Sequence, residues 1–486
     1  MSHHKMKKST VMILLATLSL MMLFSGCGKT TTAEQKSTSA ENTGVIGASL
    51  ELITDWEIRA EITLDTQVDI NGTGVKYQDG TILITEGGQY LFSGKAKQLQ
   101  VIVDTDEDVK LSLQGVEMTN ETGPVIYGKN ANSLYIEASD GTDNTLTDGS
   151  NYEADEDGET GKGTIFSNDT IVLCGSGTLT IEGNAKHGIC SDDDLYVEGI
   201  ALEIRANVKD GLHANDGIYI DSGTLRITAA SDCMESEGVL VINGGVIEGE
   251  SADEGIESKD VLTVNGGMIT LKVTDDGLNA ANAIVFHDGE CRIYSTAGDA
   301  IDSNGSLTIH GGTIYAYGGS APEGALDCDE TEIVINGGTV VAVGDSNSAI
   351  SEESEQISVL LSGYTKGSVV AIQEEGGKEI FSFTLEDSKS NLILSLPDLK
   401  QGKTYEVLVD GETVQNFTAD SQVISAGGST SSPGGMGGNG VMGTMPGNRN
   451  GRPDDIGNMP DGNVPDGQKM PDGNMPGKMF GGQRMQ

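Results

Sequence analysis

The chain of 486 residues contains 74 acidic and 29 basic side chains, which give it a net charge of −45. A field of this sign repels nucleic acid and anionic lipid, so both are excluded as partners, whereas cations and acidic polymers bridged by cations are favoured. Apart from Cys27, the cysteines stand singly with no CxxC pair, a pattern that favours neither a zinc site nor a disulfide framework. They are Cys174, Cys190, Cys233, Cys291 and Cys328.

Residues 1–26 are predicted to form an export signal, because three early lysines precede an apolar run from Val11 to Phe24 that is too short for a confident transmembrane helix. The run ends in Phe24-Ser25-Gly26-Cys27, which resembles the bacterial lipoprotein cleavage box in which the cysteine becomes diacylated. We therefore expect lipidation at Cys27, a polar linker over 27–48, and an extracellular chain anchored to the outer face of the cell membrane only by its lipid. The alternative is an ordinary secretory signal, which would leave the protein soluble.

Residues 49–351 contain a repeat. Pairs of glycines recur at Gly244-Gly245, Gly266-Gly267, Gly311-Gly312 and Gly337-Gly338. Between them lies a second phrase that recurs every 22 or 23 residues and begins at Asp210, Asp232, Glu254, Asp276 and Asp299. Each repeat contains three short segments with period-two alternation and no helical periodicity. One repeat cannot cover its own apolar face, but stacked repeats can. The sequence therefore predicts an all-β chain built as a right-handed parallel β-helix.

The inward rows follow from aligning the repeats. The third strand supplies a large apolar row of Leu212, Met234, Ile256, Leu278 and Ile301, followed two places on by a small row of Ala214, Ser236, Ser258, Ala280 and Ser303. Cys291 and Cys328 align with inward rows, so buried, inert thiols are predicted there. Cys190 and Cys233 align with outward or turn positions, where the sequence leaves their role open.

Less regular strand pairs from Ile62 to Ala138 are predicted to form earlier coils, and the polar stretch Asp140 to Lys162 to form an insertion loop. Residues 352–425 alternate apolar and polar residues without the repeat, which indicates a small C-terminal β capping module. Residues 426–486 are mostly Gly, Met, Pro, Asn and Asp, so a disordered tail is predicted, with no purpose that the sequence reveals.

Acidic residues stack at two positions of the third strand, about 4.8 Å apart between neighbouring coils. At that spacing two carboxylates repel by about 1 kcal/mol in water and by more in a partly dry groove. Because Lys and Arg are scarce here, Ca²⁺ is the expected cofactor. Its candidate ligands are Asp210, Asp232, Glu235, Glu254, Glu257, Asp276, Asp299 and Asp302. The alternative is a solvated acidic face that maintains solubility.

A candidate sugar surface lies on the strand after the Gly pair, in the last two coils. Its outward residues are Arg292, Tyr294, Tyr315 and Tyr317. Tyrosine rings can stack on pyranose faces, and arginine can pair with uronate carboxylates. The alternative is that these are ordinary outward residues with good strand propensity.

The repeats closely resemble a clostridial-type extracellular carbohydrate-binding β-helix family. The resemblance rests on His187-Gly188-Ile189, the series Asp-Gly-Leu-x-Ala and the block from Asn144 to Gly149, and it covers most of Ile62 to Ala419. It implies a pectate-lyase-like fold, Ca²⁺ binding at the acidic turns (Asp210, Asp232, Asp276 and Asp299), and binding of cellulose or polygalacturonate without cleavage. No sugar-contact residue can be carried over. Cys233 and Ala300 replace the usual glycine after the acid, which leaves the local turn geometry open.

Two other functions stay open at this stage. A polysaccharide (pectate) lyase would need an Arg or Lys base near Ca²⁺, for which Arg226 and Arg292 are the candidates. A surface scaffold or adhesin would bind a protein partner instead. The favoured hypothesis is a monomeric, non-catalytic protein that binds extracellular polysaccharide with the help of Ca²⁺.

Overall fold

The computed structural model describes residues 50–154, 158, 160–428 and 430, and these residues form strands, turns and bends. None of the described residues belongs to a helix long and apolar enough to cross a membrane. The predicted signal, the linker, the lipidation site Cys27 and almost all of the predicted disordered tail lie outside the described residues.

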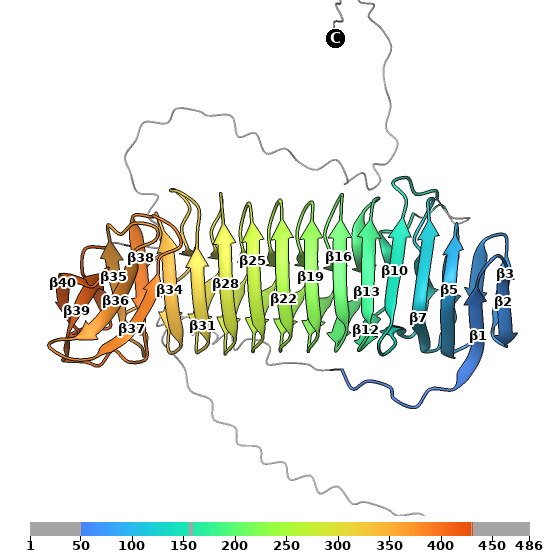
Figure 1. The fold of residues 1–486 in the computed structure, drawn as a ribbon, viewed down its shortest axis with the longest axis horizontal. Helices are drawn as coiled ribbons and strands as arrows, with labels where there is room; N and C mark the ends of the chain where they lie inside the picture. The colour runs from blue at the N-terminus through green and yellow to red at the C-terminus, as the bar shows by residue number, and fades with distance from the viewer. Residues whose placement is uncertain (1–49, 155–157, 159, 429, 431–486) are drawn as a thin grey trace, which may run out of the picture. The chain divides into compact units, whose positions relative to one another are not determined.

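The chain is all-β and winds into a parallel β-solenoid whose coils each present three strands, which we call the first, second and third faces. The second face turns toward the viewer in Figure 1. It contains β1 (Ile58–Leu64), β5 (Gly88–Lys97), β7 (Val109–Asn120), β10 (Asp143–Asp148), β13 (Thr178–Gly183), β16 (Ala201–Ala206), β19 (Thr224–Ala229), β22 (Val246–Ser251), β25 (Met268–Val273), β28 (Glu290–Ser295), β31 (Thr313–Tyr317) and β34 (Thr339–Gly344).

The first face precedes the second in each coil. Its strands are β9 (Leu134–Ala138), β12 (Ile171–Gly175), β15 (Asp194–Glu198), β18 (Gly217–Ile220), β21 (Val239–Ile242), β24 (Val261–Val264), β27 (Ala283–Phe286), β30 (Ser306–Ile309) and β33 (Val334–Ile335). The long strand β7 pairs with both β9 and β10, so it contributes to the first and second faces together.

The third face is a separate 12-stranded sheet. Its strands are β3 (Val75–Gln78), β4 (Thr81–Ile84), β6 (Gln100–Asp104), β8 (Ile126–Asn130), β11 (Gly163–Ser167), β14 (His187–Ser191), β17 (Leu212–Ala214), β20 (Met234–Ser236), β23 (Ile256–Ser258), β26 (Leu278–Ala280), β29 (Ile301–Ser303) and β32 (Leu326–Cys328). All neighbours in it pair in parallel except β3 and β4, which form an antiparallel hairpin.

The predicted inward rows are confirmed. Leu212, Met234, Ile256, Leu278 and Ile301 occupy one register position on successive third-face strands and are fully buried. The small row beside them is buried as well, and the serine hydroxyls donate to backbone carbonyls, as that of Ser236 does to Val239 at 3.0 Å. Each branched side chain buried in this way contributes about 1.5–3 kcal/mol. The repeated apolar positions therefore form one continuous core.

The structure also settles the cysteines. Cys291 and Cys328 lie in the core as predicted. Cys233, which aligned with a turn, points its side chain into the same core and is fully buried. Cys190 does stand at an outward position, in register with His213, but it is covered by a small apolar cluster with Tyr127 and Phe166.

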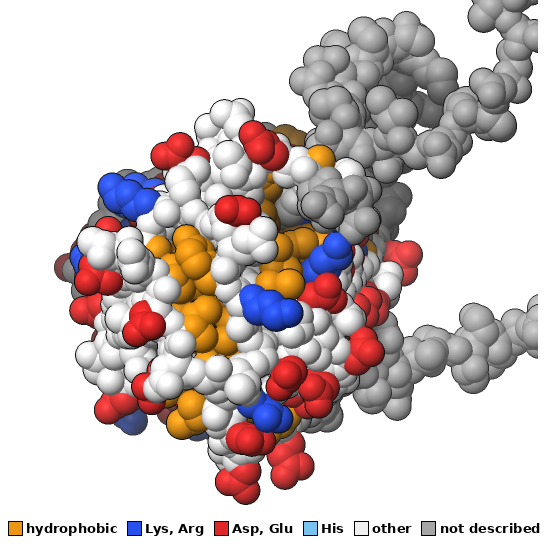
Figure 2. All heavy atoms as spheres, turned by 90° about the vertical axis from the view of Figure 1, so that its right-hand side faces the viewer, with side chains coloured by type: hydrophobic (Ala, Val, Ile, Leu, Met, Phe, Trp, Pro, Cys, Tyr) orange, Lys and Arg blue, Asp and Glu red, His pale blue; other side chains and the backbone are white. Residues whose placement is uncertain are grey.

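At the N-terminal end, β2 (Val68–Gly72) pairs antiparallel with β1. Figure 2 looks onto this end and shows hydrophobic side chains in its middle, with mostly acidic side chains around them. The predicted insertion loop is shorter than expected, because Asp143–Asp148 within it forms β10, in parallel register with β7 and β13. The prediction was wrong there because threonine and leucine at alternate positions continue the second face.

The C-terminal β module begins with β35 (Ser358–Ser362), β38 (Asn391–Ser395) and β41 (Val423–Ser425). β38 pairs antiparallel with β34, so it closes the open edge of the last parallel strand. A four-stranded antiparallel sheet follows the order β37 (Glu379–Thr384), β36 (Val369–Glu374), β39 (Thr404–Val409) and β40 (Glu412–Thr418). The module has its own core, which includes Tyr405 and Phe417 and which also buries Tyr317 of β31.

Candidate functional site

Two rows of mostly acidic side chains, with histidine and cysteine at their N-terminal end, run along the third face. The turn that leads into each third-face strand carries what we call the leading row: His187, Asp210, Asp232, Glu254, Asp276 and Asp299. The centre of each strand carries the outward row: Cys190, His213, Glu235, Glu257, Asn279, Asp302 and Asp327, in register from coil to coil. All eight predicted metal ligands lie in these two rows. Asp210, Asp232, Glu235 and Asp299 are at least 94% buried.

The leading row is held by the backbone. The Asp210 carboxylate accepts the N–H of Asp232 at 3.2 Å, and Asp232 accepts the N–H of Glu254 at 3.1 Å. Further along, Asp276 accepts the N–H of Asp299 at 2.7 Å. Each of these bonds uses Oδ1, so the second carboxylate oxygen is left to face other groups. A buried acid that accepts a backbone N–H is partly compensated, which explains how acids can stack at the spacing of adjacent coils.

Basic side chains compensate the N-terminal part of the rows. Asp210 Oδ2 lies 2.9 Å from His187 Nδ1 and 3.4 Å from His213 Nδ1. Glu235 lies 3.3 Å from both His213 Nδ1 and Lys259 Nζ. Burial by itself would raise the pKa of Asp210, but the two histidines hold it well below its ordinary value. Burial likewise opposes protonation of His213, yet Asp210 and Glu235 raise the pKa of His213 to about 9.

Acids outnumber cations in the middle of the rows. Asp232, Glu254 and Glu257 offer carboxylate oxygens within 4.8 Å of one another, and Lys259 contacts only Glu257 of these three. Burial, followed by the neighbouring acids Glu254 and Asp210, raises the pKa of Asp232 to about 10. Glu254 also belongs to a group with Asp253 and Asp275, whose carboxylate oxygens again lie within 4.8 Å.

The C-terminal part of the rows includes Asp276, Asp299 and Asp302, whose pKa values are all raised. Burial first and nearby carboxylates second raise the pKa of Asp276 and of Asp302 to about 7 and that of Asp299 to about 9. Within residues 50–154 and 160–428, no Lys, Arg or His forms an ion pair with these three aspartates. Clustered carboxylate oxygens are the ligands that Ca²⁺ prefers, so the groups of Asp232, Glu254 and Glu257 and of Asp253, Glu254 and Asp275 fit this ion.

The predicted sugar surface requires a correction. Tyr317 is 98% buried and packs against the C-terminal module, so the four predicted residues do not form one open patch. Tyr294 stacks on Tyr317 with ring centroids 5.1 Å apart, and its hydroxyl donates to Glu386 at 2.9 Å. Arg292 lies 4.3 Å above the Tyr315 ring and pairs with Glu290 at 3.0 Å. The sequence could not reveal this because the module that covers Tyr317 carries no repeat.

A groove runs along the second face beside these residues. One part has a volume of about 510 Å³ and is lined by residues of β13, β16, β19, β22 and β25. A second part, of about 730 Å³, shares Glu250, Thr270 and Lys272 with the first and extends to Tyr294 and Glu386. Arg226 pairs with Glu248 at 2.9 Å and Lys272 with Glu250 at 3.5 Å on the groove floor. Of the predicted patch, Tyr294 lines this groove.

A family model described as a carbohydrate-binding domain-containing protein matches residues 78–320 and 238–380. The chain belongs to this carbohydrate-binding family. A relative with the same description, from Acetivibrio thermocellus, is 32% identical over 192 residues, which is 39% of this chain and 62% of the relative. The chain thus spans less than two thirds of that relative's length. A solved structure described as a polysaccharide lyase-like protein from C. thermocellum, in a gadolinium derivative, has 28% identity and a TM-score of 0.43 over 52% of this chain and 96% of that one.

Several residues of this carbohydrate-binding chain escaped the sequence reasoning. His187 and Cys190 stand in the same two rows as the predicted acids, one coil earlier, and Asp327 extends the outward row by one coil. Asp253 and Asp275 lie beside the leading row in adjacent turns. The repeat itself could have found His187, Cys190 and Asp327, because extending the alignment by one coil in each direction places them at equivalent positions. Asp253 and Asp275 stand directly before leading acids in coils that were already aligned.

Proposed function

We propose that the chain is a non-catalytic polysaccharide-binding protein that holds Ca²⁺ along the third face and binds an acidic polysaccharide, of the polygalacturonate class, in the groove of the second face. Carbohydrate binding in general follows from the family, and the choice of an acidic polymer is carried by one observation. The groove collects Arg205, Arg226 and Lys272, with Arg292 on the next coil. These are four of the seven Lys and Arg residues between Gly163 and Ser351 in a chain of net charge −45.

The spacing of these cations suits a polymer. They stand on β16, β19, β25 and β28, and neighbouring strands of a sheet are about 4.8 Å apart. A polyuronate carries one carboxylate on every sugar, so a chain that lies across the coils meets repeated cations. Each cation is already near a glutamate on the groove floor, and exchange of that partner for a uronate costs little at an exposed site. The partly exposed Tyr294 ring would contribute apolar contact at the end of the groove.

Ca²⁺ belongs to the proposal because uncompensated acids adjoin the groove. Ser251 and Thr274 line its second part, and in the turns Asp253 stands two residues after Ser251 and Asp275 directly after Thr274. An ion held by Asp253, Glu254 and Asp275 would lie at the rim of the groove, where it could also attract a uronate carboxylate. Ions held by Asp232, Glu254 and Glu257, or by Asp276, Asp299 and Asp302, would instead stabilise the coils. Asp210 and Glu235 already face His213, so we assign them a lesser part in Ca²⁺ binding than the sequence suggested.

The lyase alternative receives no support from the two candidate bases. Arg226 and Arg292 each pair with a glutamate on the second face, and Glu290 holds the pKa of Arg292 above its ordinary value. Paired, protonated guanidinium groups are poor proton acceptors. We also propose that the chain is exported, that a lipid on Cys27 anchors it to the cell membrane, and that it is displayed at the cell surface as a monomer. A scaffold that binds a protein partner is the outcome that remains if no glycan binds.

The experiment is calorimetric titration of EDTA-treated protein with Ca²⁺, followed by retention on immobilised polygalacturonate and on cellulose in both metal states. We expect Ca²⁺ uptake and retention on polygalacturonate that falls when the metal is removed. Absence of uptake would remove Ca²⁺ from the proposal, and retention on cellulose alone would move the ligand to a neutral glycan. Absorbance from an unsaturated product in the mixture would overturn the non-catalytic assignment.

A further inference from the structure

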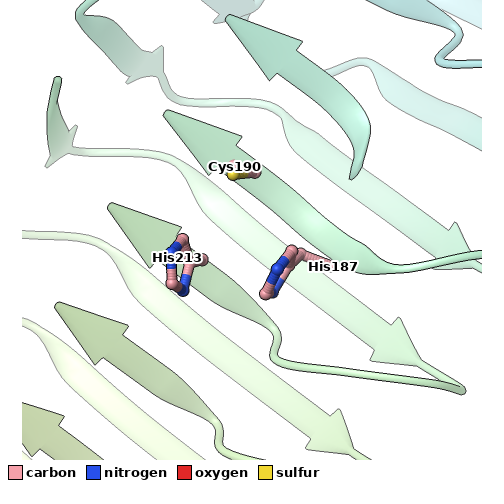
Figure 3. A group of neighbouring side chains, drawn as sticks. All are labelled: His187, Cys190 and His213. Atoms are coloured by element: carbon pink, nitrogen blue, oxygen red, sulfur yellow. The ribbon is translucent and has the colours of Figure 1, made fainter. Parts of the chain in front are cut away.

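The N-terminal end of the two rows differs in chemistry from the rest. His187 begins β14, Cys190 stands on the same strand, and His213 is the register partner of Cys190 on β17. Figure 3 shows the three side chains grouped over these two neighbouring strands. One ring nitrogen of each histidine and the Cys190 sulfur all lie within 4.8 Å of one another, and the two rings are 4.4 Å apart between centroids.

Two members of the group are buried, and the His213 side chain is 12% exposed. Cys190 is fully buried and His187 is 94% buried. Nδ1 of His187 and Nδ1 of His213 are buried atoms that have no hydrogen-bond partner within the described residues, although both lie near the Asp210 carboxylate. In the chain these nitrogens face only carboxylates, Asp210 for both and Glu235 for His213, and a metal ion between them and Asp210 Oδ2 would satisfy both nitrogens at once.

We propose that His187, Cys190 and His213 bind one divalent transition-metal ion, with Zn²⁺ the best match, and that Asp210 supplies the fourth donor through Oδ2. Imidazole nitrogen and thiolate sulfur are ligands of borderline metals, whereas Ca²⁺ takes oxygen. This site is therefore distinct from the proposed Ca²⁺ positions further along the rows. It also does not depend on the proposed carbohydrate function, because it uses the third face and not the groove.

A tetrahedral site needs only small shifts of these side chains. Zn–N distances of about 2.0–2.1 Å and Zn–S distances of about 2.3 Å place the donors of a tetrahedral site roughly 3.3–3.8 Å apart. The three donors, which lie within 4.8 Å of one another, would have to approach by about 1 Å, whereas Asp210 Oδ2, now 2.9 Å from His187 Nδ1, would have to move away from it. Burial raises the pKa of the Cys190 thiol, so the metal has to displace its proton on binding. Asp210 Oδ1 stays with the N–H of Asp232, which would orient Oδ2 toward the metal.

The test is titration of the metal-free full chain with Co²⁺, which reports thiolate ligation as a charge-transfer band in the near ultraviolet. We expect one equivalent of Co²⁺ to produce the band and Zn²⁺, but not millimolar Ca²⁺, to abolish it. Cys190→Ser should remove the band. His213→Gln should weaken Co²⁺ binding by more than about tenfold, because even residues that only support metal ligands typically cost 10–100-fold.

Matched controls lie elsewhere in the chain. Cys291→Ala removes a buried core thiol and His287→Gln removes a histidine that stacks on His310, and both variants should keep the band. A wild-type chain without the band, a band that survives in Cys190→Ser, or equal loss in His287→Gln would overturn the assignment. X-ray absorption of the Zn²⁺-loaded wild type gives a second readout that needs no variant to fold. A sulfur scatterer at about 2.3 Å supports the site, and a shell of light atoms alone refutes it.

Discussion

The sulfur of Cys233 occupies the space that a side chain at residue 249 would otherwise fill. A Cβ added at Gly249 would lie 2.8 Å from Cys233 Sγ. In neighbouring coils the glycine stands at the position of Cys233 and the larger side chain at the position of Gly249. A Cβ at Gly211 would lie 2.4 Å from Ile227 Cγ2, and one at Gly277 would lie 2.1 Å from Ile293 Cγ2. The glycine after the leading acid thus makes room for a branched side chain from the second face. In the coil with Cys233, the cysteine replaces that glycine and Gly249 replaces the branched residue, so the backbone path is unchanged.

This exchange predicts strong coupling between residues 233 and 249. Gly249→Ile alone should overpack the core and destabilise it by about 1–3 kcal/mol, and Cys233→Gly alone should leave a cavity. The double variant restores the arrangement of the neighbouring coils, so it should be more stable than the sum of the single changes by at least about 1 kcal/mol. Denaturant unfolding of the four proteins measures the cycle. Additive effects would show that the two residues are independent.

Asp299→Asn should have opposite effects in the two metal states. The amide oxygen can still accept the N–H of Gly324, which Asp299 Oδ1 accepts at 2.5 Å. The variant is neutral in both states, so it does not have to take up a proton on folding as Asp299, with its raised pKa, does. In EDTA the variant should be more stable than the wild type by on the order of 1 kcal/mol. With Ca²⁺ it should lose part of the metal-induced rise in melting temperature. Asp288→Asn is the control, because the exposed Asp288 also accepts a backbone N–H, that of Gly289 at 2.8 Å. An equal response in both variants would contradict Ca²⁺ binding near Asp299.

Stability in EDTA should fall as pH rises from about 5 to about 8. The folded pKa values of Asp276 and Asp302, about 7, lie above the ordinary value of 3.8. The folded chain therefore binds more protons than the unfolded chain in this window, and by linkage its stability decreases with increasing pH. The raised pKa of His213, about 9, acts in the same direction. Melting temperatures across the window test the sign. Ca²⁺ should flatten the profile, and a rise with pH in EDTA would contradict the burial of these acids.

Removal of groove cations should weaken retention on polygalacturonate. Arg226→Gln and Lys272→Gln each delete one charge-assisted contact worth about 1 kcal/mol, which corresponds to a roughly fivefold loss of affinity. The matched control is Lys403→Gln, because Lys403 also pairs with a glutamate, Glu374, at 2.5 Å, but lies in the C-terminal module. Binding isotherms at fixed ionic strength compare the three variants. An equal loss in Lys403→Gln would indicate non-specific charge attraction in place of the groove.

Much of the site could be predicted because a parallel solenoid places equivalent residues directly above one another. Glu235 and Glu257 are register partners, as are Leu212 and Met234, and both relationships follow from counting along the repeat. Whether a basic side chain lies beside a stacked acid does not follow from counting residues along the repeat. Asp210 faces two histidines and Asp299 faces none, because that depends on which residue the neighbouring coil presents.

The sequence by itself determined the three-strand coil, its inward rows and the acidic rows, since these depend only on a period of 22 or 23 residues and on alternation along each strand. The tertiary structure decided what departs from the repeat. It covered Tyr317 with the C-terminal module and grouped His187, Cys190 and His213 beside Asp210. The physical reason is that a repeat predicts which positions stack, whereas burial and ligand distances depend on side-chain contacts between neighbouring coils and with a module outside the repeat.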